Sequence, residues 1–235
     1  MRYSEIDAEQ NLTVPGIIDY LQDCACFHDL DAGFGVDFWK ERDAAWILTS
    51  WNIDIIKYPV YGQKIRIRTD CYKLRTFLGF RNFRIFDETG NVLVAADSRW
   101  ALMNMVKGRP VAAAAIVGDA YGIGEALDVK WEGKHVRLPE NAEKREPFPV
   151  GTEHLDTNHH VNNGQYVSMA YAYLPEDINV VKFWADYSAQ ARLGDMIYPE
   201  VAASQDGYYV ALNNEAGDPY FTAKFYTEAI GTEGK

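Results

Sequence analysis

A short segment ahead of a predicted helix concentrates side chains that can do acid-base chemistry. Residues 154–166 read His-Leu-Asp-Thr-Asn-His-His-Val-Asn-Asn-Gly-Gln-Tyr, with one carboxylate, three imidazoles and several carboxamides. An imidazole can serve as a general base toward water because its pKa lies near neutral pH. The start of a helix offers unpaired backbone N–H groups and a partial positive charge, which suit an oxyanion. The segment therefore indicates attack of water on a carbonyl carbon.

Two predicted helices and the strands behind them must position this chemistry. One helix starts near Asn162 or Asn163, has apolar residues at helical spacing and stops at Pro175. The other has Thr13 as its N-cap and an apolar stripe that reaches Phe27. Apolar and alternating runs predict strands at 51–55, 65–71, 80–87 and 92–103, and at 178–188, 197–204, 207–213 and 219–228.

The two halves of the chain match as an internal repeat. The segment Tyr3-Ser-Glu-Ile-Asp7 aligns with Thr152-Glu-His-Leu-Asp156, and the two helices then overlap. After each helix, identical residues follow in the same order in both halves. They pair as Asp54 with Asp186, Gly62 with Gly194, Ile65 with Ile197 and Gly90 with Gly217. Several matches in one order predict a duplicated α+β unit, in which a strongly curved antiparallel sheet wraps one helix.

A charged, proline-bearing stretch between the halves predicts a linker. We expect domains at 1–110 and 147–235, with the linker at 111–146. The densest group of basic side chains falls in or beside this linker, and a solvated surface explains it better than a binding patch. These side chains are Lys130, Lys134, Arg137, Lys144 and Arg145.

Composition excludes several classes of protein. The chain of 235 residues is 48% hydrophobic, as expected for a globular protein, and its formal net charge of −11 argues against binding to nucleic acid. No apolar run approaches the ~18 residues that a membrane span needs. The cysteines Cys24, Cys26 and Cys71 have no metal-binding spacing and fit a reducing compartment. We expect a cytoplasmic protein with no metal and no cofactor.

The catalytic-looking segment resembles the signature of a known family. Asp156-Thr-Asn158-His-His160-Val-Asn-Asn163, with Tyr166 beyond it, is similar to the D-x-N-x-H-V-N-N-x-x-Y pattern of acyl-ACP thioesterases, which include plant plastid enzymes and bacterial relatives. Stretches of the first half resemble the same family, namely Arg2-Tyr-Ser-Glu-Ile-Asp7, Trp46-Ile-Leu-Thr-Ser-Trp51, Tyr58-Pro-Val-Tyr-Gly62 and Ser98-Arg-Trp-Ala-Leu-Met103.

That resemblance implies both a fold and an activity. The implied fold is a tandem double hotdog, with the acyl-chain pocket in the N-terminal hotdog and the catalytic residues in the C-terminal one. The implied reaction is hydrolysis of fatty acyl-ACP to free fatty acid and holo-ACP in fatty acid biosynthesis. The expected partner is acyl carrier protein with its phosphopantetheine-linked acyl chain, and the expected oligomeric state is a monomer or a weak homodimer.

The resemblance also assigns roles by position. Asp156, Asn158 and His160 fall on catalytic residues of the family, and a downstream family acid falls at Gln190. An amide can position water but cannot accept its proton, so if the family mechanism uses that acid as the base, His160 or Asp156 must take over the task. The next family position, a cysteine in plant members, is Ala191, which excludes a covalent cysteine mechanism there.

The predicted mechanism has one site. His160 helps to activate water while backbone donors near Asn162 and Asn163 hold the oxyanion, and Tyr166 is a further substrate-binding candidate. Asp156 and Asn158 fix substrate and water, and Gln190 is a secondary positioning group. The first half has Glu9 and Asn11 where the second has Asn158 and His160, so it lacks the imidazole.

Other interpretations stay open at this point. Asp156 and Asn158 can merely cap a helix, and a zinc site from His154, His159, His160 and Asp156 is disfavoured because ligands on one turn seldom converge. His154 and His159 are expected to be structural or exposed. Three other functions compete with the main hypothesis: an acyl-CoA thioesterase, a dehydratase of 3-hydroxyacyl thioesters, and a non-catalytic acyl-binding hotdog protein.

Overall fold

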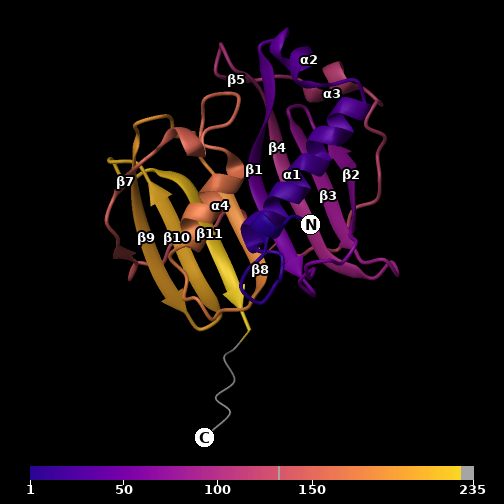
Figure 1. Ribbon diagram of the computed structural model, residues 1–235. Helices are drawn as coiled ribbons and strands as arrows, with labels where there is room; N and C mark the ends of the chain where they lie inside the picture. Colours follow the sequence, from indigo (N-terminus) through magenta and orange to yellow (C-terminus); the bar gives the residue numbers. More distant parts are fainter. Residues whose placement is uncertain (132, 229–235) are drawn as a thin grey trace, which may run out of the picture. The chain divides into compact units, whose positions relative to one another are not determined.

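The computed structural model describes residues 1–131 and 133–228, which divide into two compact units, Met1–Lys130 and Trp131–Lys235 (Figure 1). Position 132 of the predicted linker and residues 229–235 of the predicted C-terminal domain lie outside the described residues. Within the described part of the chain, no helix combines the length and the apolar character that a bilayer crossing needs.

Unit 1 is an antiparallel sheet in the order β2-β3-β4-β1, with one long helix lying across it (Figure 1). The helix is α1 (Val14–Asp31), and the strands are β1 (Ala44–Ile55), β2 (Arg66–Leu74), β3 (Leu78–Phe86) and β4 (Val92–Asn104), to which the short β5 (Arg109–Pro110) adds. The small helices are η1 (Tyr3–Glu5), α2 (Val36–Lys40) and α3 (Ala113–Val117).

Helix α1 begins where the sequence predicted. The Thr13 hydroxyl accepts a hydrogen bond of 3.1 Å from the Gly16 N–H and so satisfies a donor that the helix start would otherwise leave unpaired. Ile17, Ile18 and Leu21 are fully buried. Burying each such side chain contributes about 1.5–3 kcal/mol relative to leaving it exposed, so this apolar face holds the helix against the sheet.

Unit 2 repeats this plan with a shorter helix and the strand order β8-β11-β10-β9-β6. Its helices are η2 (Thr152–His154) and α4 (Asn163–Tyr171), and its strands are β6 (Glu143–Lys144), β7 (Phe148–Pro149), β8 (Val180–Tyr187), β9 (Met196–Ser204), β10 (Gly207–Asn213) and β11 (Pro219–Thr227). The predicted start of α4 is confirmed, whereas the helix ends four residues before Pro175, because the chain turns after Ala172.

The predicted strands are confirmed, with one marked difference. Strand β1 is 12 residues long and begins at Ala44, so the predicted 51–55 is only its end. A bulge between Leu48 and Ser50 interrupts the alternation there and hides the first part of the strand from a period-two pattern. The bounds 111–146 of the linker stay a prediction. Part of this stretch contacts unit 1, because the N–H of Gly124 donates to the Cys71 carbonyl at 2.8 Å.

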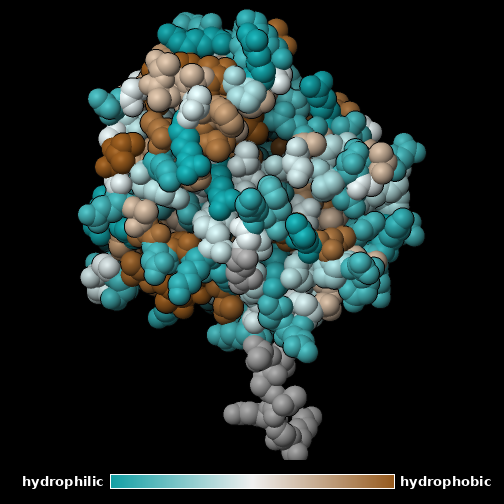
Figure 2. Space-filling view, turned by 180° about the vertical axis from the view of Figure 1, so that it is seen from behind, coloured by the Kyte–Doolittle hydropathy of each residue, from teal (hydrophilic) through white to brown (hydrophobic). Residues whose placement is uncertain are grey.

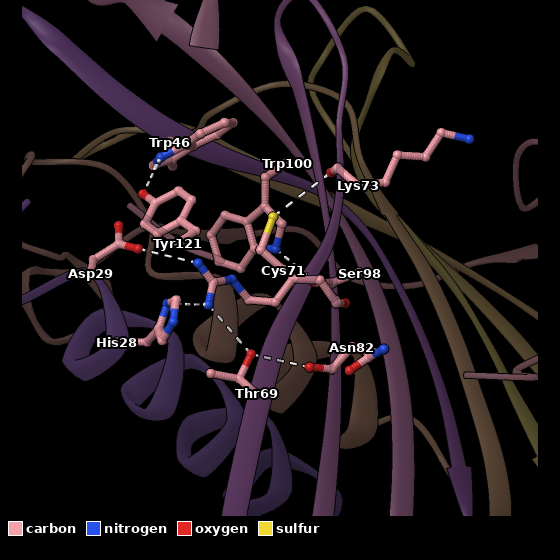
Figure 3. A network of polar contacts seen from close by, with 11 residues as sticks. His28, Asp29, Trp46, Thr69, Cys71, Lys73, Asn82, Ser98, Trp100 and Tyr121 are labelled. Atoms are coloured by element: carbon pink, nitrogen blue, oxygen red, sulfur yellow. Dashed lines mark hydrogen bonds and ion pairs between the residues drawn. The ribbon is translucent and has the colours of Figure 1, made fainter. Parts of the chain in front are cut away.

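A buried polar network lies between α1 and the sheet of unit 1 (Figure 3). Arg81 on β3 is only 7% exposed, and its guanidinium lies 2.9 Å from His28 Nδ1, 3.3 Å from Asp29 Oδ1 and 3.5 Å from the Thr69 hydroxyl. The ring of Tyr121 lies 5.2 Å from this guanidinium. Burial raises the pKa of Asp29, and the Arg81 charge opposes that rise. The network ties α1 to β2 and β3.

The surface in Figure 2 alternates hydrophilic side chains with separate apolar patches. Large apolar side chains that are more than half exposed include Phe27, Leu30, Val36, Val106 and Ile123. Single exposed apolar residues are normal on soluble domains, so we attach no function to them.

Candidate active site

A tight turn between η2 and α4 holds the predicted catalytic segment in place. Asp156 Oδ1 accepts hydrogen bonds from the N–H groups of Asn158 at 2.7 Å and His160 at 3.3 Å. The Asp156 N–H donates in turn to the His160 carbonyl at 2.8 Å. His159 takes up the left-handed conformation, with φ of 61°, that closes the turn. The carboxylate of Asp156 therefore fixes the backbone from which His160 projects.

His160 has the environment of a neutral base. The residue is 9% exposed, and its Nδ1 is buried without a hydrogen-bond partner. Burial lowers the pKa of His160, the charge of Arg192 and then His159 lower it further, and Asp156 opposes them. The imidazole is consequently neutral over a wider pH range than a free histidine and has a nitrogen lone pair available for a proton.

The segment that contains Gln190 runs alongside His160. His160 and Arg192 form an antiparallel bridge, and the Val161 N–H donates to the Ala191 carbonyl at 3.0 Å. Gln190 is exposed and stands two residues before Arg192. The fold thus brings the Gln190 segment beside the turn, although the two segments are about 30 residues apart in the chain, and the positioning role of Gln190 stays a prediction.

The oxyanion donors expected at Asn162 are already in use. The Asn162 N–H donates to the His154 carbonyl at 2.9 Å, and the Asn162 side chain accepts from the Gly164 N–H at 2.8 Å as the cap of α4. The N–H of Asn162 is therefore occupied by the turn, while the prediction that backbone donors near Asn162 and Asn163 hold the oxyanion otherwise stays a prediction. At the neighbouring residue, the Tyr187 hydroxyl donates to the Asn163 carbonyl at 3.1 Å.

Tyr166 lies in the core of unit 2. Its side chain is 2% exposed, its ring stacks on Phe221 with a 5.7 Å separation of centroids, and its hydroxyl accepts from the Ala191 N–H at 2.7 Å. Through this bond α4 holds the segment that carries Gln190. The other two imidazoles behave as expected: His154 Nδ1 accepts from the Gly151 N–H at 2.9 Å, and His159 is exposed.

Sequence reasoning missed two residues of this region, Arg192 and Tyr187. Neither belongs to the signature, and only the pairing of the two segments places them beside it. The one usable signal was the position of Arg192 two residues after Gln190, where an extended chain points side chains to the same face. As for the zinc alternative, positions 1–131 and 133–228 contain no cluster of three or more His, Cys, Asp or Glu side chains arranged for a metal ion.

Comparison with known families agrees with this geometry. Residues 1–119 match the family model of the acyl-ACP thioesterase N-terminal domain, and residues 138–223 match that of the acyl-ACP thioesterase C-terminal domain. The chain belongs to the acyl-ACP thioesterase family. The resemblance drawn from the signature is thereby confirmed, and the two family domains follow the two units in order.

The curated relatives of this acyl-ACP thioesterase family member include plant proteins. Oleoyl-acyl carrier protein thioesterase 1 of Arabidopsis thaliana is 25% identical over 195 residues, which cover 76% of this chain and 54% of the relative. Palmitoyl-acyl carrier protein thioesterase of Cuphea hookeriana is 25% identical over 194 residues, 76% of this chain and 46% of the relative. The chain spans about half the length of the curated relatives it matches.

Solved structures of acyl-ACP thioesterases share the fold along almost the whole chain. An acyl-ACP thioesterase from Bacteroides thetaiotaomicron superposes with a TM-score of 0.87 at 22% identity, covering 97% of this chain and 94% of that one. The 12:0-ACP thioesterase from Umbellularia californica gives 0.86 at 18% identity, with coverages of 97% and 94%. The predicted α+β tandem double hotdog is confirmed.

Proposed function

We propose that the chain hydrolyses the thioester of fatty acyl-ACP and releases free fatty acid and holo-ACP, in fatty acid biosynthesis. The observation that carries the proposal is His160, an imidazole just before α4 whose Nδ1 is buried without a partner and whose pKa is lowered by burial and by the charge of Arg192. Membership of the acyl-ACP thioesterase family supports the choice of thioester and carrier.

In the proposed reaction His160 takes a proton from water as the water oxygen attacks the thioester carbonyl carbon. The tetrahedral intermediate then collapses, the carbon–sulfur bond breaks, and the thiolate of the phosphopantetheine arm leaves. The protonated imidazole returns its proton to that thiolate, so the products are the fatty acid and the carrier thiol. General base catalysis of this kind contributes about 10²–10⁴-fold to the rate.

The other residues of the turn have supporting roles. Asp156 holds the turn through its bonds to the backbone of Asn158 and His160, and its charge stabilises the imidazolium that forms during the reaction. Asn158 and Gln190 are both exposed, and we assign them to positioning substrate and water. Tyr166 supports Gln190 indirectly, since its hydroxyl accepts a hydrogen bond from the N–H of Ala191, the next residue in the chain.

The proposal also includes the partner and the setting of the reaction. The partner is acyl carrier protein, the location is cytoplasmic, and the chain acts as a monomer or a weak homodimer. One observation favours a second candidate, a non-catalytic acyl-binding protein: Gln190 cannot accept a proton where the family resemblance places an acid.

Thiol release from matched acyl-ACP and acyl-CoA substrates tests the proposal. We expect release from acyl-ACP that falls by at least about 10²-fold in His160→Ala and stays near the wild-type rate in His135→Ala, which removes an exposed imidazole outside the turn. Faster cleavage of acyl-CoA would contradict the carrier, and release of no thiol from either substrate would favour the acyl-binding alternative.

A further inference from the structure

Arg192 is the direct cross-strand neighbour of the base. The bridge between His160 and Arg192, with the hydrogen bond from Val161 N to the Ala191 carbonyl beside it, makes them a non-hydrogen-bonded antiparallel pair. In such a pair the Cα atoms are about 4.5 Å apart and both side chains project from the same face. The arginine side chain therefore starts next to the imidazole.

The guanidinium of Arg192 is also unengaged. The residue is exposed, its backbone N–H donates to Asp195 Oδ2 at 2.8 Å, and among the described residues its side chain has no hydrogen bond or ion pair. This contrasts with Arg81, the buried arginine of unit 1, whose donors meet His28, Thr69 and Asp29. Arg192 thus has five N–H donors free for a ligand.

The backbone near His160 leaves a task for such a donor. Thioester hydrolysis passes through an oxyanion that needs donors close to the carbonyl carbon. The N–H groups of Asn162 and Gly164 are occupied by the His154 carbonyl and by the Asn162 side chain. Arg192 lies on the same face as the base, and a charged donor is stronger than a neutral one.

Unit 1 offers an internal control for this pairing. Its corresponding turn places Asn11 opposite Val60, in an antiparallel bridge with the hydrogen bond from Leu12 N to the Pro59 carbonyl beside it. The backbone arrangement is the same, yet unit 1 has neither imidazole nor guanidinium at the pair. Of these two pairs, only the one in unit 2 combines an imidazole with a guanidinium. Because unit 1 forms the same turn without them, neither side chain is needed to build the turn.

We propose that Arg192 is a catalytic residue of the thioesterase reaction, whose guanidinium binds the oxyanion of the tetrahedral intermediate next to His160. This inference rests on the proposed function. A phosphate of the carrier arm is a less suitable ligand, because it lies at the far end of the pantetheine arm from the thioester, whereas Arg192 starts beside the base.

The same neighbour has an electrostatic effect on the base. The charged or titratable groups that act on His160 are Arg192 and His159, which lower its pKa, and Asp156, which raises it. The carboxylate of Asp195 accepts from the backbone N–H of Arg192. Two positive charges in a cross-strand pair repel, so Arg192 favours the neutral imidazole that can accept a proton. Loss of Arg192 is therefore expected to raise the pKa of His160.

The test compares wild type with Arg192→Gln, Arg192→Lys and, as a matched control, Arg137→Gln, an exposed arginine of unit 2 outside the site. On acyl-ACP we expect Arg192→Gln to lower kcat by about 10²–10³-fold, with KM changed by much less, and the control to behave as wild type. Arg192→Lys should recover part of kcat, because it keeps the charge but loses the planar fork of donors.

Two readouts separate this inference from the proposed function. A proton NMR titration should show the pKa of His160 higher in Arg192→Gln than in wild type, and near the wild-type value in Arg192→Lys. An unchanged pKa, an unchanged kcat, or an effect confined to KM in an active enzyme overturns the role of Arg192 alone. Absence of thiol release by the wild type overturns the proposed function and the oxyanion role with it.

Discussion

The turns that precede the two central helices have the same backbone and different chemistry. In unit 1 Asp7 Oδ1 accepts from the Asn11 N–H at 2.7 Å, and the Asp7 N–H donates to the Asn11 carbonyl at 2.9 Å. Asp156 and His160 in unit 2 make the same two bonds at 3.3 and 2.8 Å. The left-handed residue also matches, with φ of 67° at Gln10 and 61° at His159.

The shared backbone of the two turns distinguishes residues that build the turn from residues proposed for catalysis. Both turns use an aspartate to close the backbone, so Asp156 has a structural duty that does not depend on catalysis. The imidazole and its arginine neighbour are found only in unit 2, where unit 1 has Asn11 and Val60. The proposed catalytic groups therefore lie on a turn whose backbone also forms in unit 1 without them.

The helix-facing sides of the two sheets differ in a second way. Both units bury aromatic rings there, Trp51 against Phe83 in unit 1 and Tyr166 stacked on Phe221 in unit 2, and unit 1 adds the charged network around Arg81. A buried ion pair costs desolvation and depends on all its partners, while an aromatic stack does not. The packing of α1 on the sheet of unit 1 is consequently sensitive to loss of a single partner in the Arg81 network.

Exchanging the paired residues of the turns gives the largest expected effect. His160→Asn, which copies Asn11, should reduce thiol release by about 10²–10⁴-fold, because the base is removed. The Tm should stay within about 5 °C of wild type, since the same residue type fits this turn in unit 1. The reciprocal Asn11→His should leave the rate of release unchanged. A gain of activity in that variant would contradict a single site.

Breaking the charged network of unit 1 is expected to have the next largest effect. Arg81→Met leaves the carboxylate of Asp29, whose side chain is 19% exposed, without its cation, which should lower the free energy of unfolding by about 3 kcal/mol, the lower end for a buried pair. Chemical denaturation measures this loss. The double variant Arg81→Met/Asp29→Leu should recover much of it, because no buried charge then remains; failure to recover would show that the network has no such dependence.

Replacing the two turn aspartates, Asp7 and Asp156, should have the smallest effect on stability and tests whether they have the same structural role. Asp7→Ala and Asp156→Ala are each expected to cost about 1 kcal/mol in stability, from the lost hydrogen bonds, measured by denaturation. Asp156→Asn keeps the acceptor but removes the charge that raises the pKa of His160. The pH below which activity is lost through protonation of His160 should therefore be lower in Asp156→Asn than in wild type. This shift is opposite to the one expected for Arg192→Gln. Asp7→Asn should leave the pH profile of activity unchanged.

Much of this molecule was predictable because the controlling interactions are local. Thr13 and Asn162 cap their helices through bonds to residues two or three positions away, and such caps are visible in sequence. The turn at Asp156 is equally local. Strand β1 was predicted too short because its bulge depends on pairing with β4, which is a long-range interaction.

The sequence by itself determined the repeat, the family signature, the position of the proposed base His160 and the glutamine at position 190, where the family resemblance places an acid. Only the tertiary structure decided which groups surround that base. The Arg192 pairing, the use of the Asn162 N–H by His154 and the burial of the Tyr166 hydroxyl against Ala191 each depend on which chain segments lie side by side. Hydrogen-bond donors and charges act over a few ångströms of space, whatever the number of residues between them.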